Sequence, residues 1–316
     1  MSKVVHRKKR LSSFKLIVLG FAAVIFVGAL LLMLPVSSVS GTQTPFHEAL
    51  FTSVSAVCVT GLVVQDTGSY WSSFGQAVIL LLIQTGGLGV ITVAVSFAIL
   101  SGRKISLMQR STMQDAISAP KIGGIVRLTK FSVQGTLFIE LLGMTAMLPI
   151  FFRDYGIKGI WMAAFHSVSA FCNAGFDLLG TSSQPFVSLS RYIANPLINL
   201  VIMLLIIIGG IGFLTWDDVR TNRLCFHRYR LQSKVILTAT ALLILLPTLY
   251  FFCFEFKGGT LRERLLLSLF QSITPRTAGF NTADYTSLSS SGRGLTILLM
   301  FIGGSPGSTA GGIKTT

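Results

Sequence analysis

A series of long apolar runs constrains this chain more than any other feature of its sequence. Each run approaches or exceeds the about 20 residues that an α-helix needs to cross a bilayer. Five runs are complete and a sixth begins near Leu295; the five are Phe14–Leu34, Phe74–Leu100, Leu128–Phe152, Ile193–Trp216 and Val235–Phe256. Hydrophobic residues make up 51% of the chain and charged residues only 12%. The sequence therefore predicts an all-α polytopic membrane protein.

The positive charges follow the predicted spans. In a soluble protein a net charge of +15 would favour nucleic acid as a partner. Here Lys and Arg gather at the N-terminus and in the connections after the second and fourth spans, which the positive-inside rule assigns to the cytoplasm. These residues are Arg103, Lys104, Arg110, Lys121, Arg127 and Lys130 in the first connection, and Arg220, Arg223, Arg228, Arg230 and Lys234 in the second. We predict no nucleic-acid partner; both connections are candidates for docking a protein partner or contacting membrane lipids.

Three shorter segments on the opposite side repeat one another. They read "FTSVSAVCVTGL" from Phe51, "FHSVSAFCNAGF" from Phe165 and "FQSITPRTAGF" from Phe270. Aligned on Ser53, Ser167 and Ser272, they share a glycine at Gly61, Gly175 and Gly279. Each unit reads span, short segment ending in glycine, span, and such internal repeats decide an architecture.

A short segment such as Ala49–Val57 is too brief to span a membrane but long enough to re-enter it. Irregular backbone at that depth is tolerated where it is buried in protein or lines a water-filled cavity. Repeated re-entrant loops present backbone carbonyls that replace the water around a cation such as potassium, and glycine reaches the required conformations without strain. The predicted filter stretches, Cys58–Leu62, Cys172–Phe176 and Arg276–Phe280, contain the candidate filter residues Cys58, Val59, Thr60, Gly61, Cys172, Asn173, Ala174, Gly175, Thr277, Ala278 and Gly279.

Several charged residues near these loops are further candidates. Asp66, Asp177 and Asp284 follow the three glycines, either to attract cations or to form turns. Glu140 lies inside the third span without an evident partner, which makes it a functional candidate. Arg276 precedes the third filter, and we expect its side chain to point behind the filter, toward carbonyls or a carboxylate, because a cation in the ion path would oppose ion binding.

The second span of each unit carries a glycine cluster: "QTGGLGV" at Gln84, "IGGIGF" at Ile208 and "IGGSPG" at Ile302. The last cluster opens a stretch of small residues in which Gly and Pro interrupt the helical hydrogen bonds. We expect the helix to break there and the loop to lie across the ion path. The loop residues are Gly303, Gly304, Ser305, Pro306, Gly307, Ser308, Thr309, Ala310, Gly311 and Gly312.

The three filters, "PRTAGFNT" at Pro275–Thr282 and the "GGSPGSTAGGIKTT" tail resemble the Trk/Ktr/HKT superfamily of potassium transporters, most closely its bacterial KtrB-type subunits. The resemblance covers essentially the whole chain. It implies four span–loop–span units arranged pseudo-fourfold around one pore, with Gly303–Gly312 as the gate. It also implies a homodimer in the bacterial inner membrane, on a cytoplasmic ring of RCK-type subunits that bind the nucleotide. The chain itself is then expected to bind no cofactor, with potassium, and sodium as an open alternative, as its substrate.

The predicted organisation has six parts. They are a basic N-terminus (1–13), a first unit (14–100), a basic loop (101–127), a second unit (128–216), a second basic loop (217–234) and an incomplete third unit (235–316). The resemblance implies that the rest of the third unit and a fourth filter are missing from this sequence. We therefore expect it to be a piece of a longer protein that does not close a pore alone.

Three other functions compete with the potassium pore. An intramembrane serine protease would use Ser305, but no histidine is well placed at its depth, so we predict no enzyme. A sodium-coupled secondary transporter also has broken helices, but here the repeats share one orientation. A non-conducting scaffold predicts that Gly175→Ser leaves ion selectivity unchanged, whereas a filter predicts a change.

Overall fold

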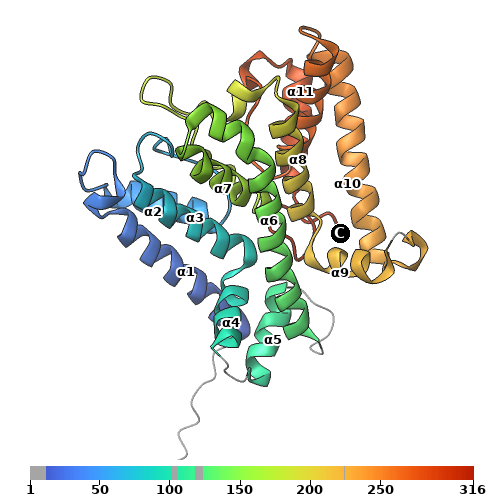
Figure 1. Ribbon diagram of the computed structural model, residues 1–316. Helices are drawn as coiled ribbons and strands as arrows, with labels where there is room; N and C mark the ends of the chain where they lie inside the picture. Colours follow the sequence, from blue (N-terminus) through green and yellow to red (C-terminus); the bar gives the residue numbers. More distant parts are fainter. Residues whose placement is uncertain (1–11, 102–104, 118–123, 224) are drawn as a thin grey trace, which may run out of the picture.

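The computed structural model describes residues 12–101, 105–117, 124–223 and 225–316. These residues form helices, and their only β-type pairings are isolated bridges. Three helices among them are long and apolar enough to cross a membrane: α1 (Ser13–Leu32), α6 (Ile125–Tyr155) and α10 (Leu231–Tyr250), which continues as a π-helix to Glu255. Each begins one of the predicted units (Figure 1).

A shorter helix follows each of these spans and packs back against it. These helices are α2 (Phe46–Val57), α7 (Lys158–Phe171) and α11 (Leu261–Ile273). The serines used to align the repeats make equivalent contacts: Ser53 donates to Ile25 O at 2.7 Å, and Ser167 donates to Glu140 O at 2.6 Å. In the third unit the hydroxyl of Ser272 bonds that of Thr248 at 2.7 Å. The repeated letters therefore correspond to a repeated packing arrangement.

The second spans of the first two units differ from the continuous spans expected at Phe74–Leu100 and Ile193–Trp216. The first is two helices, α3 (Ser73–Leu88) and α4 (Val90–Leu100), bent by 94° at the break. The second is α8 (Pro196–Gly210) and α9 (Phe213–Asn222), bent by 96°. Left-handed glycines form the breaks, Gly89 with φ +84° and Gly212 with φ +88°. Counted as one span each, the bent pairs raise the candidate spans to five in the described residues.

The glycine clusters at these breaks permit close approach to the short helices. A Cβ on Gly86 would stand 2.0 Å from the carbonyl oxygen of Val57, at the end of α2. A Cβ on Gly209 would stand 2.0 Å from the carbonyl oxygen of Phe171, at the end of α7. Any side chain at either position would push the span away from the short helix, so the clusters are required for packing as well as for the bend.

The third unit ends in a helix and a loop. Helix α12 (Ser290–Phe301) is followed by non-helical chain, as the tail sequence predicted. The first predicted basic loop contains the helix α5 (Leu107–Ile117), and α9 runs into the second. Of the basic residues assigned to these regions, Arg103, Lys104 and Lys121 lie outside the described residues, as does most of the 1–13 segment.

Candidate selectivity filter and gate

The three predicted filter stretches, hereafter called filter strands although none is a β-strand, share one backbone pattern. Each strand has a left-handed residue two positions before its left-handed glycine, with a right-handed or extended residue between them. The pairs are Val59 (φ 55°) and Gly61 (75°), Asn173 (56°) and Gly175 (70°), and Thr277 (64°) and Gly279 (81°). Positive φ is a strained choice for a β-branched residue such as Val59 or Thr277. Such alternation lets successive carbonyl groups point to one side, as a cation site requires.

The three strands lie against one another in chain order. A Cβ on Gly61 would meet Ala174 O at 2.5 Å, and a Cβ on Gly175 would meet Ala278 O at 2.7 Å. A Cβ on Gly279 would lie 3.2 Å from the Cα of Gly175. Segments more than 100 residues apart in sequence thus bring their glycines together at backbone contact. The first strand contacts the second and the second contacts the third, which is the order expected of three neighbouring members of a ring.

Hydrogen bonds from the short helices hold the strands from behind. Ser55 O accepts the Thr60 N–H at 2.9 Å, and Ser169 O accepts the Ala174 N–H at 2.8 Å. The Ser169 hydroxyl also donates to Phe176 O at 2.7 Å. At the equivalent position of the third unit, Thr274 O accepts from Ala278 N–H and its hydroxyl donates to Phe280 O. These bonds fix the backbone of each strand to the end of its own short helix.

The short helices end at the base of the strands. Cys58 and Cys172, the first residues of their strands, are the C-caps of α2 and α7. A helix C-terminus carries partial negative charge, which favours a cation nearby. Val57, Cys58 and Val59 line a cavity of about 360 Å³ together with the break at 86–89 and the tail residues 307–311. This cavity lies against the start of the first strand.

The tail forms one side of that cavity. The Thr309 hydroxyl donates to Phe171 O, the last residue of α7, at 2.9 Å. The Ser305 N–H donates to Gly210 O at 3.0 Å, and Gly307 O accepts the Phe213 N–H at 2.9 Å. The loop 303–312 is thus held against the break between α8 and α9, at the depth where the predicted ion path runs.

Ser305 lacks the surroundings of a nucleophile. It is fully buried, and its hydroxyl lies 3.2 Å from that of Thr315. Among the described histidines, the buried His166 is bonded through its ring nitrogens to Met162 O at 2.7 Å and Leu178 N at 3.4 Å. The imidazole ring therefore helps to hold the second outer loop and is not available to Ser305 as a base.

Arg276 lies behind the strands and lines a small cavity with Asn173 and Thr240. We expected the Arg276 side chain to contact carbonyls or a carboxylate. Within the described residues it makes no hydrogen bond or ion pair to either. Its Nε is buried without a partner.

Glu140 has a partner that the sequence did not suggest. The Gln84 amide nitrogen of α3 donates to its carboxylate at 3.2 Å. The thiol of Cys172 lies 3.7 Å from the Gln84 amide oxygen and 4.0 Å from the Glu140 carboxylate. This cluster joins the first and second units behind the second strand. No periodicity in the sequence relates residues 84 and 140.

The three acidic residues after the glycines occupy different environments. Asp66 is buried and accepts from the Ser69 hydroxyl and the Phe186 N–H, so it fixes loops. Asp284 accepts from the N–H and hydroxyl of a threonine two residues later, as a turn former does. Asp177 is half-buried, two residues beyond Gly175, and burial raises the pKa of its carboxyl to about 6. Like Asp284, Asp177 accepts the N–H of the residue two positions later, Leu179, at 3.0 Å, and of the three it lies nearest in sequence to its filter glycine.

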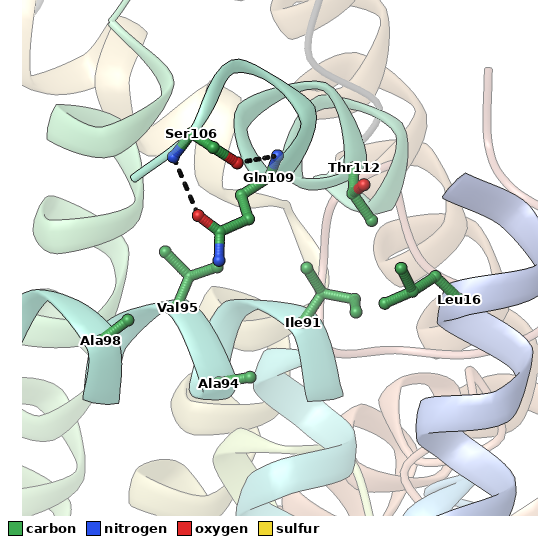
Figure 2. Close-up of a pocket in the computed structure, with 8 residues that line it drawn as sticks. All are labelled: Leu16, Ile91, Ala94, Val95, Ala98, Ser106, Gln109 and Thr112. Atoms are coloured by element: carbon green, nitrogen blue, oxygen red, sulfur yellow. Dashed lines mark hydrogen bonds between the residues drawn. The ribbon is translucent and has the colours of Figure 1, made fainter. Parts of the chain in front are cut away.

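A second cavity, of about 420 Å³, lies between α1, α4 and α5 (Figure 2). Its lining is largely apolar, and its polar edge is formed by Ser106 and Gln109. The Gln109 side chain accepts the Ser106 N–H at 2.9 Å, and the Ser106 hydroxyl accepts the Gln109 N–H at 3.3 Å. These paired bonds cap the start of α5.

Comparison with known proteins agrees with this architecture. The family model described as TrkH, cation transport protein, matches residues 12–257 and 256–316. The chain belongs to the TrkH family of cation transport proteins. It is 42% identical to the potassium/sodium uptake protein NtpJ of Enterococcus hirae, over 98% of this chain and 68% of that protein. It is 41% identical to the Ktr system potassium uptake protein B of Bacillus subtilis, over 96% of this chain and 67% of that protein.

The fold also matches a solved structure. The crystal structure of the potassium transporter TrkH from Vibrio parahaemolyticus superposes with a TM-score of 0.71 at 21% identity, over 98% of this chain and 60% of that one. The predictions of an all-α polytopic membrane protein and of the family are thereby confirmed. The chain spans about two thirds of the length of the curated relatives and less of the solved one.

Proposed function

We propose that this chain is the ion-conducting part of a potassium uptake protein. The observation that carries the proposal is the meeting of three strands with one backbone pattern, at Gly61, Gly175 and Gly279. A cavity lined by the end of α2 and by the tail lies beside the first strand. Potassium is the substrate, exchanging its water for the strand carbonyls. The names of the relatives, which mention potassium uptake and in one case sodium, support this choice.

The loop 303–312 acts as the gate. It lies below the strands, and its hydrogen bonds to Phe171 and Gly210 hold it across the path. Opening requires those bonds to be exchanged or broken while the strands stay in place. The narrow strands would then select the ion and the loop would set the rate.

The intact protein works as a homodimer with a cytoplasmic RCK-type ring that binds the nucleotide, in the bacterial cell membrane and with its N-terminus inside. The word "system" in the names of the Ktr relatives supports a partnered assembly. The basic residues of the α9 region, including Arg220 and Arg223, give an acidic partner or anionic lipid a place to bind.

The test is rubidium or potassium uptake by bacterial cells that lack their own potassium uptake systems. Cells that make the full protein together with its partner subunits should grow at low potassium and accumulate rubidium. The proposal fails if the protein reaches the membrane, as shown by fractionation, and no uptake follows. Uptake of sodium without potassium would instead favour the sodium-coupled alternative.

A further inference from the structure

A small cavity lies behind the second and third strands. Its volume is about 20 Å³, and apolar side chains of α8 and α11 form most of its wall. Three polar residues complete the wall: Asn173 from the second strand, Arg276 at the start of the third, and Thr240 from α10. The cavity therefore touches two neighbouring strands and the span behind them.

Two of these polar residues present atoms with no partner. The Oγ1 of Thr240 and the Nε of Arg276 are both buried and make no hydrogen bond within the described residues. Thr240 as a whole is only 7% exposed. Native proteins leave few buried polar atoms unsatisfied, and bound water is the usual partner of those that find none in the protein.

Asn173 supplies an acceptor for the same space. Its side-chain amide is satisfied when its nitrogen donates to Ile206 O at 3.3 Å and Ala170 O at 3.2 Å. In that orientation its oxygen takes the place beside Gly210, another residue of the cavity wall, and lies about 3.5 Å from where a Cβ would stand. A donor, an acceptor and a hydroxyl thus surround one small volume.

We propose that one water molecule occupies this cavity and bridges Arg276, Thr240 and Asn173, fixing the second and third filter strands relative to each other. A cavity needs roughly 10–15 Å³ to hold a water, and such a water has two to four polar partners. This cavity meets both conditions. It offers no acidic group to Arg276, and its volume leaves no room for a larger ligand.

The water bears on selectivity, a consequence that rests on the proposed filter. Asn173 holds a left-handed conformation two residues before Gly175, and Arg276 directly precedes the left-handed Thr277. A bridge between these two positions sets the spacing of carbonyls on neighbouring strands. Its loss would relax that spacing, and discrimination between potassium and sodium would fall while the transmembrane packing remained.

Thr240 offers a matched pair of variants away from the ion path. Thr240→Val keeps the shape and removes the hydroxyl, whereas Thr240→Ser keeps the hydroxyl and removes a methyl group. In the full protein with its partners, the ratio of KM for sodium to KM for potassium should fall roughly fivefold in Thr240→Val, from one buried hydrogen bond. Thr240→Ser should retain the ratio.

Density maps fine enough to show ordered water provide a readout that does not depend on transport. We expect one density peak in the cavity of the wild type and of Thr240→Ser, and none in Thr240→Val. An empty cavity in the wild type, a peak that exchanges with bromide, or unchanged selectivity in a folded Thr240→Val would each overturn the proposal. If the wild type shows the peak but transports no potassium, the proposed function fails and the water site stands.

Discussion

Gly175, the middle one of the three filter glycines, leaves no room for an added methyl group. Its φ of +70° is left-handed, which costs an L-residue about 1–2 kcal/mol. A Cβ there would lie 2.7 Å from Ala278 O and 2.9 Å from the Cα of Gly279, both backbone atoms of the next strand. Forced overpacking of this kind costs about 1–3 kcal/mol. Gly175→Ala should therefore cost about 2–5 kcal/mol, part of it relieved by moving the Ala278 carbonyl.

That displacement is what the transport assay detects. Moving one carbonyl away from its ion should reduce potassium-over-sodium selectivity by about tenfold, since roughly 1.4 kcal/mol of lost discrimination corresponds to that factor. The assay is rubidium uptake under sodium competition, together with the thermal midpoint of the purified protein.

Gly41 provides the matched control. Its φ is +68°, and a Cβ there would meet nothing within 4 Å. Gly41→Ala therefore carries the conformational cost of about 1–2 kcal/mol without the contact, and its selectivity should match the wild type. If Gly175→Ala keeps full selectivity, or if both variants shift selectivity equally, the assignment of Gly175 to a filter is wrong.

Three further predictions follow from the site. Because burial raises the Asp177 pKa to about 6, the carboxylate forms as pH rises through 6, so the potassium KM should fall across that range, and Asp177→Asn should flatten the profile. The same raised pKa means that stability is lost as pH rises from about 4, the usual pKa of an Asp, to about 6 and is not regained above it, so Asp177→Asn should raise the thermal midpoint more at pH 8 than at pH 5. Glu140→Gln still offers an oxygen to the Gln84 amide and should keep potassium selectivity. Glu140→Ala removes that acceptor and should reduce potassium selectivity several-fold. Equal effects of the two variants would show that the charge of Glu140 matters instead of the hydrogen bond. Thr309→Val removes the bond to Phe171 O and should raise maximal uptake several-fold at unchanged selectivity, with Thr309→Ser as the control.

The repeated segments determined much of the candidate site from sequence alone. Alignment on three serines assigned a glycine to each strand; all three glycines are left-handed, and Gly175 lies against both Gly61 and Gly279. The need for glycine is a local property of the backbone, so each short segment carries its own signal. The small residues of 303–312 likewise predicted a loop, since neither glycine nor proline sustains a helix.

The bends in the second spans were missed because hydropathy does not distinguish a straight span from a broken one. Residues 74–100 and 193–216 are mostly apolar and contain no charged residue, and the bend is set by φ at Gly89 and Gly212. The signal was present in the clusters, which place a glycine three residues after Gly86 and Gly209. The pairing of Gln84 with Glu140 depends on how whole helices pack against one another. A single sequence does not contain that information.

The three glycine clusters explain how the loop of the third unit can serve as the proposed gate against the second unit. At Gly86 and Gly209 the chain passes against the end of its own short helix and continues as a second helix. At the corresponding place in the third unit, Pro306 replaces the glycine of the bend and no second helix follows within residues 303–316. The freed loop instead bonds to the second unit through four hydrogen bonds, from Ser305 and Thr309 and to Gly307 O. At about 0.5–1.5 kcal/mol net each, these bonds hold the loop by about 2–6 kcal/mol. A partner that binds the open form roughly 10⁴-fold more tightly supplies about 5.5 kcal/mol, which exceeds all but the top of this range. The proposed gate is thus weak enough to be opened by a regulatory subunit and strong enough to stay closed without one.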